Sequence, residues 1–599
     1  MIGTYRRVLE LLEPRDRRIW FGLIGMSVVL GLFEAAGVVS ILPFLAIASD
    51  PGLLTRPGFL RDAYSASGLG SPARFQILLG CVVFATVVGG IAFRTLTLYR
   101  QTRFSGDQAA RLSIRLFKSY LFRPYVWFLG QSSARMGKGI LSEVEQVVSG
   151  SIVSSMNLIA HAAVALCILS VLIAVDPGTA LLVGGGLAAA YGLILVTMRQ
   201  RLHRLGQARV AANQARFAIV QEALGGIKEV KLHHLEGAFA DRFRAPAEHV
   251  AGFRAKITLI SEAPRHLLEI IMFGGMIIFV IVVLARHDND LLAALPVLGL
   301  YAFAGVRLIP VLQLLYRSYA TLRADGAALA ELHGELAGLP PPPETRPAKG
   351  LPPLRLNESL ELRNASFRFP GGWRDALSHL TLQVPAKSTT GIVGRTGAGK
   401  STLVDVILGL LPLDSGSIRI DGRSLEADDI QRWQATVGYV PQSIHLLDDT
   451  IAANIAFGAD PERIDMQAVA RAAETAELDG FVRTLDEGYD SMVGERGVRL
   501  SGGQRQRIGI ARALYREPDV LVLDEATSAL DTLTERAVLD AVDRLGGEKT
   551  ILIVAHRLSI MRRCDSLILM ENGRILDRGS CDDLRLRNAL FAEMHEAGQ

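Results

Sequence analysis

The chain has 599 residues, of which half are hydrophobic and 21% are charged, and its formal net charge is only +4. Its mean hydropathy is +0.29, and because soluble globular proteins rarely average positive, a membrane-embedded portion is expected. We expect no nucleic-acid partner, because the net charge is small and the sequence has no basic tract with interleaved aromatic residues.

Six apolar stretches in the first half of the chain are predicted to span a membrane. Each holds about the 20 apolar residues that cross a hydrocarbon core. They cover residues 19–46, 75–98, 152–175, 179–198, 266–285 and 291–315. Several arginines precede the first stretch, which is too long for the apolar core of a signal peptide. It is therefore predicted to be a retained span, with the N-terminus in the cytoplasm.

The connections between these stretches alternate between short and long. Only residues 176–178 and 287–290 join the third to the fourth stretch and the fifth to the sixth. The second-to-third and fourth-to-fifth connections are long and rich in arginine and lysine, which predicts that they are cytoplasmic. Apolar residues recur in them at three-to-four spacing, so we expect helices that extend into the cytoplasm and turn back near 124–128 and 225–229.

A proline-rich segment divides the chain in two. Residues 1–338 are predicted to form a transmembrane domain with six helices and two cytoplasmic coupling-helix loops, and residues 339–355 a linker. Residues 356–599 have the pattern of a soluble α/β domain, in which short apolar strands such as 521–523 and 551–554 are separated by helical segments.

A glycine-rich loop follows a strand-like run and opens a helical one, and it fits the pattern G-x-x-x-x-G-K-[ST]. It comprises Gly394, Arg395, Thr396, Gly397, Ala398, Gly399, Lys400 and Ser401, with Thr402 next in the chain. Its backbone amides would wrap the phosphates of ATP, Lys400 would contact the β- and γ-phosphates, and the Ser401 hydroxyl would bind Mg²⁺. The alternative, a chance glycine loop, is disfavoured by the strand and helix on either side.

Two carboxylates, Asp524 and Glu525, follow the apolar run 520–523. Ligands bind at the carboxyl ends of strands in α/β sheets, so this pair is predicted beside the glycine-rich loop. Asp524 would hold Mg²⁺, directly or through water, and Glu525 would act as general base on the attacking water. The alternative, a merely acidic strand end, is disfavoured by the glycine-rich loop upstream.

The run at 500–504 reads L-S-G-G-Q and opens a helical segment rich in arginine, so its amides predict an anion site. With this motif the chain resembles the ABC transporter family. The resemblance implies an α-helical six-span transmembrane domain of the exporter type and an α/β P-loop ATPase domain. In that family two nucleotide-binding domains sandwich two ATP molecules, and the signature of one covers the P-loop of the other. The signature residues would be Ser501, Gly502, Gly503 and Gln504.

Further positions match motifs of the family one by one. Phe369 stands at the adenine-stacking position, which is usually tyrosine, so the stacking ring is kept and a hydroxyl is lost. Gln442 matches the glutamine near Mg²⁺ and the attacking water, Asp531 the D-loop, and His556 the histidine on the γ-phosphate. The segment 493–497 matches the one that exporters place against the partner's coupling helix. No catalytic position is degenerate, so the resemblance favours a homodimer over a heterodimer.

Charged residues inside or beside the apolar stretches are the internal clue to the substrate, because charge in a membrane is costly unless it is functional or paired. Arg94, Arg265 and Arg307 would form a cationic site for an anionic group such as a pyrophosphate if they face a central cavity. Pairing with Glu34 or Glu269, or extension of the arginines to the membrane surface, is the alternative.

The membrane half is similar to PglK-like bacterial flippases of lipid-linked oligosaccharides. The similarity rests on residues 33–50, 92–94, 264–269 and 307–310. It implies ATP-driven flipping of a polyprenyl-pyrophosphate glycan across the bacterial inner membrane, with the bilayer, a second copy of the chain and an amphipathic lipid-linked substrate as partners. An exporter of another cargo, such as a lipid A-like lipid, a drug or a peptide, is one alternative. An ATP-gated channel or regulator without pumping is the other, and the intact Glu525 speaks against it.

Overall fold

The structure is a computed structural model that describes residues 2–175, 177–286, 291–337, 352–494, 497–525, 540, 544–555 and 557–597. By its contacts the chain separates into two compact units. Unit 1 comprises Met1–Arg123 and Gln131–Pro343, and unit 2 comprises Pro124–Gly130 and Glu344–Gln599. Most of the predicted linker and the whole connection 287–290 lie outside the described residues.

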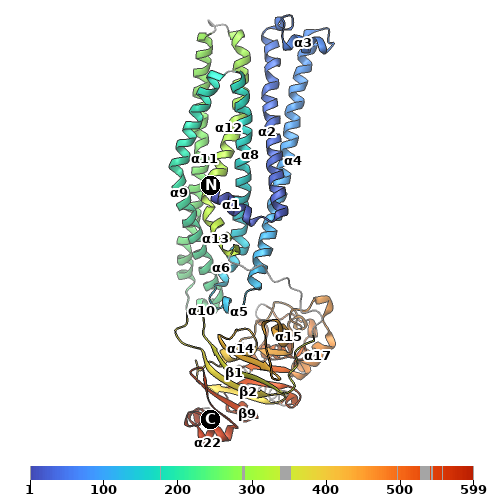
Figure 1. Cartoon of the computed structure of the whole chain (residues 1–599), viewed down its shortest axis with the longest axis vertical. Coiled ribbons are helices and arrows are strands. Elements are labelled where there is room, and N and C mark those ends of the chain that lie inside the picture. The colour runs from blue at the N-terminus through green and yellow to red at the C-terminus, as the bar shows by residue number, and fades with distance from the viewer. Residues whose placement is uncertain are drawn as a thin grey trace. The chain divides into compact units, whose positions relative to one another are not determined.

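Six long helices form the greater part of unit 1 (Figure 1). They are α2 (Pro14–Ser49), α4 (Pro72–Leu121), α8 (Ser154–Val175), α9 (Pro177–Gly225), α11 (Glu236–Arg286) and α12 (Leu291–Ala324). Each of the predicted spans falls on one of these helices. Helices α4, α9 and α11 have 50, 49 and 51 residues. Each is therefore about 75 Å long, more than twice the ~30 Å of a hydrocarbon core, so these helices must continue beyond the membrane.

Within the described part of the chain, four helical stretches are long and apolar enough to cross a membrane. They are Pro14–Ala48, Pro72–Leu121, Ser133–Val175 and Gly299–Ala324. The spans predicted at 179–198 and 266–285 lie in α9 and α11, where several side chains are outside the described residues.

The long helices of unit 1 pack along apolar faces. Helix α2 packs against α4 and α8, α8 against α12, and α9 against α11. One buried cluster joins Val38 of α2, Ile168 of α8 and Leu300 of α12. Gly206 of α9 lies so close to the backbone of Ala324 that a larger residue would not fit. Small residues allow this kind of close approach between the helices of membrane proteins.

Shorter segments connect and flank the long helices. They are α1 (Ile2–Leu11), α3 (Phe59–Ala66), α6 (Ser133–Lys138), α7 (Val144–Val147), α10 (Ile227–Leu232) and α13 (Gly326–Ala337). Two π-helical turns, Gly139–Glu143 and Val148–Val153, lie on either side of α7. Insertions of this kind in a helix are frequent at functional positions, and here they border a polar cavity of unit 1.

The segment Pro124–Gly130 lies in sequence between helices of unit 1 but belongs by its contacts to unit 2. It contains α5 (Tyr125–Phe128), at the first of the two turns predicted in the long connections, and Val126 packs against the core of unit 2. Helix α10 overlaps the second predicted turn and belongs to unit 1, and its Val230 is buried.

Unit 2 contains two sheets. The four-stranded antiparallel sheet has the order β2-β1-β4-β5 and consists of β2 (Leu377–Pro385), β1 (Ser359–Phe367), β4 (Ser415–Ile420) and β5 (Arg423–Ser424). The six-stranded sheet has the order β10-β9-β3-β8-β7-β6. Its strands are β10 (Arg574–Gly579), β9 (Ser566–Glu571), β3 (Thr389–Gly394), β8 (Thr550–Val554), β7 (Val520–Asp524) and β6 (Val437–Val440). All of its pairs are parallel except β9 with β10.

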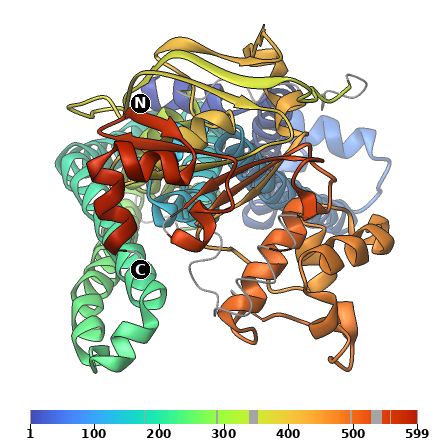
Figure 2. The same ribbon diagram turned by 90° about the horizontal axis from the view of Figure 1, so that it is seen from below.

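The central strands of the six-stranded sheet are buried on both faces, as expected for parallel strands. Ile392 and Val522 point into a core shared with β1, β2 and α14 (Lys400–Ile407). Val393 and Leu521 point into a second core with helices on the other face. These helices include α16 (Ile451–Ile455), α17 (Met466–Thr475), α18 (Asp479–Val482) and α19 (Gly502–Leu514). Figure 2 shows them gathered at one side of unit 2, away from the strands β1 and β2.

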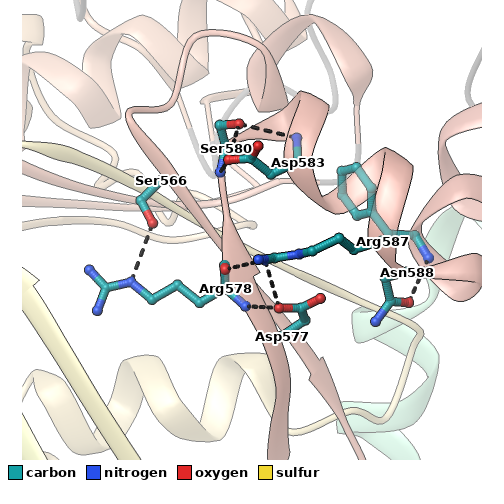
Figure 3. Close-up of polar contacts among 8 residues, drawn as sticks. Ser566, Asp577, Arg578, Ser580, Asp583, Arg587 and Asn588 are labelled. Carbon is teal, nitrogen blue, oxygen red and sulfur yellow. Dashed lines mark hydrogen bonds and ion pairs between the residues drawn. The ribbon is translucent and has the colours of Figure 1, made fainter.

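The C-terminal helices are fixed to the edge of the six-stranded sheet (Figure 3). Ser580 caps α22 (Cys581–Arg587), because its hydroxyl accepts a hydrogen bond of 3.2 Å from the backbone amide of Asp583. At the other end of α22, Arg587 donates to the Asp577 carboxylate at 2.9 Å and to the Arg578 carbonyl at 2.8 Å. The helix is thereby tied to β10, and α23 (Ala589–Ala597) follows.

Candidate active site

The glycine-rich loop connects the end of β3 to the start of α14, as the sequence predicts. Gly397 and Gly399 have positive φ values of 81° and 99°, a region that L-residues with side chains rarely adopt. A side chain on Gly399 would also approach the carbonyl oxygen of Ala376 at 2.8 Å. The glycines therefore let the loop turn tightly and present its amides at the N-terminus of α14, the place where helices bind phosphate.

Lys400 is folded back into this loop with 7% of its surface exposed. Its ammonium group donates to the carbonyls of Gly394 at 2.7 Å and Arg395 at 3.2 Å. Burial lowers the pKa of Lys400, and the charges of Glu525 and Asp524 act in the opposite direction. The ammonium group thus occupies a partly desolvated position where an added anion would stabilise its charge.

Asp524 ends β7 and is 8% exposed, and Glu525 follows it at a positive φ of 50°. Glu525 accepts a hydrogen bond of 2.7 Å from the side-chain amide of Gln442, which follows β6. Because β6 and β7 are parallel neighbours, their carboxyl ends bring these two groups together. A carboxylate oriented by an amide in this way is suited to accept a proton from water.

Three of the predicted site residues, Ser401, Gln442 and Asp524, fit a Mg²⁺ site by their chemistry. A hydroxyl, an amide oxygen and a carboxylate are the oxygen ligands that Mg²⁺ prefers. Burial, followed by the nearby charge of Asp524, raises the pKa of Asp405 in α14 to about 6. Two carboxylates that disfavour each other's charge mark a place where a cation would be stabilising. When bound, the cation would neutralise phosphate charge.

A cavity of about 1230 Å³ brings part of the predicted ATP-binding set together, whereas Gly394, Arg395 and Ala398 of the loop are not among its lining residues. Its lining includes Phe369, Thr396, Gly397, Gly399, Lys400, Ser401, Thr402, Gln442 and Glu525. The half-buried ring of Phe369 meets that of Phe367 edge to face, with 5.0 Å between the ring centroids. This contact holds an apolar ring at the cavity wall, where a nucleotide base could stack.

Sequence reasoning missed part of this cavity. Trp373 and Arg374, in the loop between β1 and β2, line it, as does the turn between β9 and β10 around Asn572. Trp373 is 85% exposed, and the Arg374 guanidinium lies 5.0 Å from its ring centroid. An unusual tryptophan four residues after Phe369 was the available signal for the first group. The turn around Asn572 had no such signal in the sequence, because its position beside the cavity depends on how the strands pair.

The signature motif starts α19, where the sequence predicts a helix. Ser501 and Gln504 form a capping box: the Ser501 hydroxyl accepts the Gln504 amide at 3.2 Å, and the Gln504 side chain accepts the Ser501 amide at 2.7 Å. Arg505 donates to the Leu500 carbonyl at 2.9 Å and secures the preceding loop. None of the residues 501–504 is among those that line the P-loop cavity. Asp531 and His556, predicted to complete the site, lie outside the described residues, as do residues 495 and 496.

Two of the three arginines predicted to bind substrate are paired with glutamates. Arg307 of α12 lies 3.0 Å from Glu34 of α2, and Arg265 lies 2.9 Å from Glu269 on the same helix, α11. Arg94 of α4 is exposed. The structure thus shows, for Arg265 and Arg307, the pairing that the sequence left as the alternative to a cationic site. Such pairing lowers the cost of placing charge in a membrane.

Replacing Glu525 by glutamine should abolish hydrolysis and leave nucleotide binding intact. The amide is close to the carboxylate in shape but cannot accept the proton of the attacking water, so we expect turnover to fall at least about 100-fold. Steady-state ATPase assays and equilibrium ATP binding on the same preparation measure both properties. Asp577→Asn, at a carboxylate of β10 that is not among the residues lining the cavity, is the control. Hydrolysis within a few-fold of the wild type would remove Glu525 from its proposed role.

Trp373 should report directly on the base of the nucleotide. If it stacks beside Phe369, MgATP should quench its fluorescence and Mg-triphosphate, which lacks the base, should not. Loss of one stacking contact should weaken ATP binding about 2- to 10-fold in Trp373→Ala. Trp373→Phe should keep the affinity and lose the fluorescence change. Equal quenching by ATP and triphosphate, or unchanged affinity in Trp373→Ala, would contradict the assignment.

Comparison with known proteins covers both halves of the chain. Residues 39–254 match the ABC transporter transmembrane region, and residues 377–528 match the ABC transporter family. An ATP-dependent lipid A-core flippase of Cupriavidus metallidurans is 29% identical over 593 residues, which is 99% of this chain and 96% of the flippase. One from Burkholderia orbicola is 30% identical, over 98% of this chain and 95% of the flippase.

Among solved structures, a bacterial Atm1-family ABC exporter with ATP bound is similar, with a TM-score of 0.77 and 27% sequence identity. The alignment covers 97% of this chain and 98% of the exporter. The predicted fold class, a helical transmembrane domain joined to an α/β nucleotide-binding domain, is confirmed. With relatives matched over almost their whole length, the chain belongs to the ABC transporter family, as an ATP-hydrolysing exporter half-transporter that joins a membrane domain to a nucleotide-binding domain.

Proposed function

We propose that two copies of this chain form a homodimer that uses ATP hydrolysis to flip a phosphorylated glycolipid across the bacterial inner membrane. The observation that carries the proposal is similarity over the whole length, membrane half included, to proteins named lipid A-core flippases. This favours a lipid A-like cargo, which the sequence analysis gave as an alternative, over the lipid-linked oligosaccharide that it placed first.

The geometry of the P-loop cavity supports the hydrolytic role. Lys400 is held among loop carbonyls where phosphates would contact it, and Glu525 is oriented by Gln442 at the same cavity. We assign Glu525 as general base, with Ser401, Gln442 and Asp524 as the groups that hold Mg²⁺. His556 is proposed to contact the γ-phosphate. A channel or regulator would not need this arrangement, because gating by ATP binding requires no efficient general base.

The position of the signature supports a dimer. The amides at the start of α19 make an anion site, yet the motif lines no part of the P-loop cavity of the same chain. A second copy in a two-fold arrangement could supply its signature to the cavity of the first, and the reverse. Each chain carries both halves of such a site, so identical copies suffice. We place Asp531 in the same interface.

Mixed dimers test whether the signature acts in trans. Lys400→Ala and Ser501→Arg should each disable one half of a site. Suppose that each site combines the P-loop of one chain with the signature of the other. When the two changes are on different chains, one of the two sites then stays intact. When both changes are on one chain and its partner is wild type, neither site is intact. Both arrangements are made in a Glu525→Gln background, so that bound nucleotide is not hydrolysed. After desalting, doubly tagged dimers should therefore retain nucleotide only in the first arrangement. Retention in the second arrangement alone would mean that each site belongs to one chain.

Reconstituted protein tests the cargo. In proteoliposomes, a lipid A-core glycolipid should stimulate ATPase activity and be flipped in an ATP-dependent manner, while a neutral glycolipid with similar chains should not. A polyprenyl-pyrophosphate glycan is the matched competitor. If only the polyprenyl-pyrophosphate glycan stimulated ATPase activity and was flipped, the cargo would be a lipid-linked oligosaccharide instead. Steady ATP hydrolysis with no lipid movement in any arm would refute the flippase proposal.

A further inference from the structure

A polar cavity of about 740 Å³ lies within unit 1, between the π-helical segment around α7 and the helices α9, α11 and α12. It is built where these helices leave the predicted membrane spans on the cytoplasmic side. Arg317 follows the end of the sixth predicted span by two residues, and Ser149 precedes the third by three. The cavity therefore lies across the expected membrane boundary: Asn157 and Leu314 fall inside predicted spans, and most of the other lining residues lie on the cytoplasmic parts of the helices.

The basic side chains of this cavity outnumber its acidic ones. Its lining contains four arginines, which are Arg209, Arg216, Arg254 and Arg317. It also contains three carboxylates, which are Glu143, Glu145 and Asp325. The carboxylates are largely neutralised: Glu143 lies 2.5 Å from the buried ammonium of Lys138, and Asp325 is bound by Arg209. Glu145 is left as the acidic group that faces the remaining arginines.

Three arginines keep their charge available to a ligand. Arg216 donates to the neutral side chain of Asn213 at 2.7 Å. Arg254 has no ion-pair partner among the described residues and is exposed. Arg317 lies 3.5 Å from Glu262, which is outside the cavity lining, so its charge is only partly compensated. Arginine binds phosphate through two parallel N–H donors, and three such groups on three helices favour a phosphorylated ligand.

Another part of the cavity wall is held together by contacts of Asp325. Asp325, at the junction of α12 and α13, is 4% exposed and accepts a hydrogen bond of 3.0 Å from Gln146. It also binds Arg209 of α9, and Gly150 packs so closely against it that no larger residue would fit. This network joins three segments without using Arg216, Arg254 or Arg317. Asn157 and several serines complete the lining and offer hydrogen bonds to sugar hydroxyls.

From these observations we infer that the cavity receives the phosphorylated sugar head group of the transported lipid on the cytoplasmic side, with Arg216, Arg254 and Arg317 as its phosphate ligands. The inference rests on the proposed function and identifies where the substrate is first held. A volume of about 740 Å³ suits a head group and not the whole lipid, so the acyl chains would stay in the bilayer. It also assigns recognition to residues other than Arg94, Arg265 and Arg307.

The test measures how much lipid A-core glycolipid is needed for half-maximal stimulation of ATPase activity in proteoliposomes. For Arg254→Gln/Arg317→Gln we expect this concentration to rise at least about tenfold, because two charged hydrogen-bonding groups are lost. Arg254→Lys/Arg317→Lys, which keeps the charge and loses the paired donors, should give an intermediate value. Arg242→Gln/Arg244→Gln changes two arginines of α11, the helix that carries Arg254, which are outside the cavity lining. This variant should behave as the wild type.

Two further arms separate the sources of phosphate. The dephosphorylated glycolipid should not stimulate ATPase activity above the basal rate in the wild type or in any variant. Inorganic phosphate at millimolar concentration should not reproduce the stimulation; if it did, free phosphate would be the ligand and the head-group assignment would be overturned. If the wild type is stimulated normally and the glutamine variant has the same half-maximal concentration, the assignment of the head group to this cavity is overturned. The flippase proposal then still stands. No response of the wild type to any phosphorylated glycolipid overturns both.

Discussion

The buried ammonium of Lys400 is the interaction on which the second unit depends. It lies between two loop carbonyls, beside Asp524 and Glu525 and at the start of α14, so opposite charges crowd into a partly desolvated space. Burial lowers the pKa of Lys400 and, together with the charge of Asp524, raises that of Asp405, so burial disfavours the charged form of both groups. Phosphates and a divalent cation would relieve both effects. The sheet, the glycine turns and the strand order serve to hold this arrangement before ligand arrives.

The sequence was sufficient to place Lys400 and Glu525 at one cavity because both residues stand near strand ends. Lys400 and Glu525 each follow a short apolar run within a few residues, so the rule that carboxyl ends of parallel strands meet at one edge places them together. The turn around Gly573 could not be found in this way. Its carbonyl accepts the Ser378 amide at 2.9 Å, and that contact links residues almost two hundred positions apart. Only the contact in three dimensions between β2 of one sheet and the β9–β10 turn of the other creates that part of the cavity wall.

In the membrane half, hydropathy was enough to predict helices at the six apolar stretches but not the partners of the charges. Arg307 looked like a candidate substrate ligand because a charge in an apolar stretch is costly, and the same cost is met by its ion pair with Glu34 on another helix. Conversely, Arg216 and Arg254 resembled ordinary cytoplasmic residues of the kind that the positive-inside rule expects. Their assembly around one cavity depends on how α9, α11 and α12 pack, which a helical period alone does not specify.

The chain crosses between its two units three times, so both ends of the inserted segment 124–130 are joined directly to unit 1. The chain enters unit 2 after Arg123, leaves it after Gly130, and enters it again after Pro343. The inserted segment is anchored by Val126 in the core of unit 2, and burial, with a contribution from Asp405, raises the pKa of Tyr125. Asp405 belongs to α14, the helix that begins with Lys400, and it senses the charge of Asp524. The inserted segment and α14 therefore share one core, and the two ends of the segment continue into α4 and toward α6. Coupling through packed side chains needs a contiguous path of this kind, and here each step lies within one compact unit before the covalent chain carries it onward.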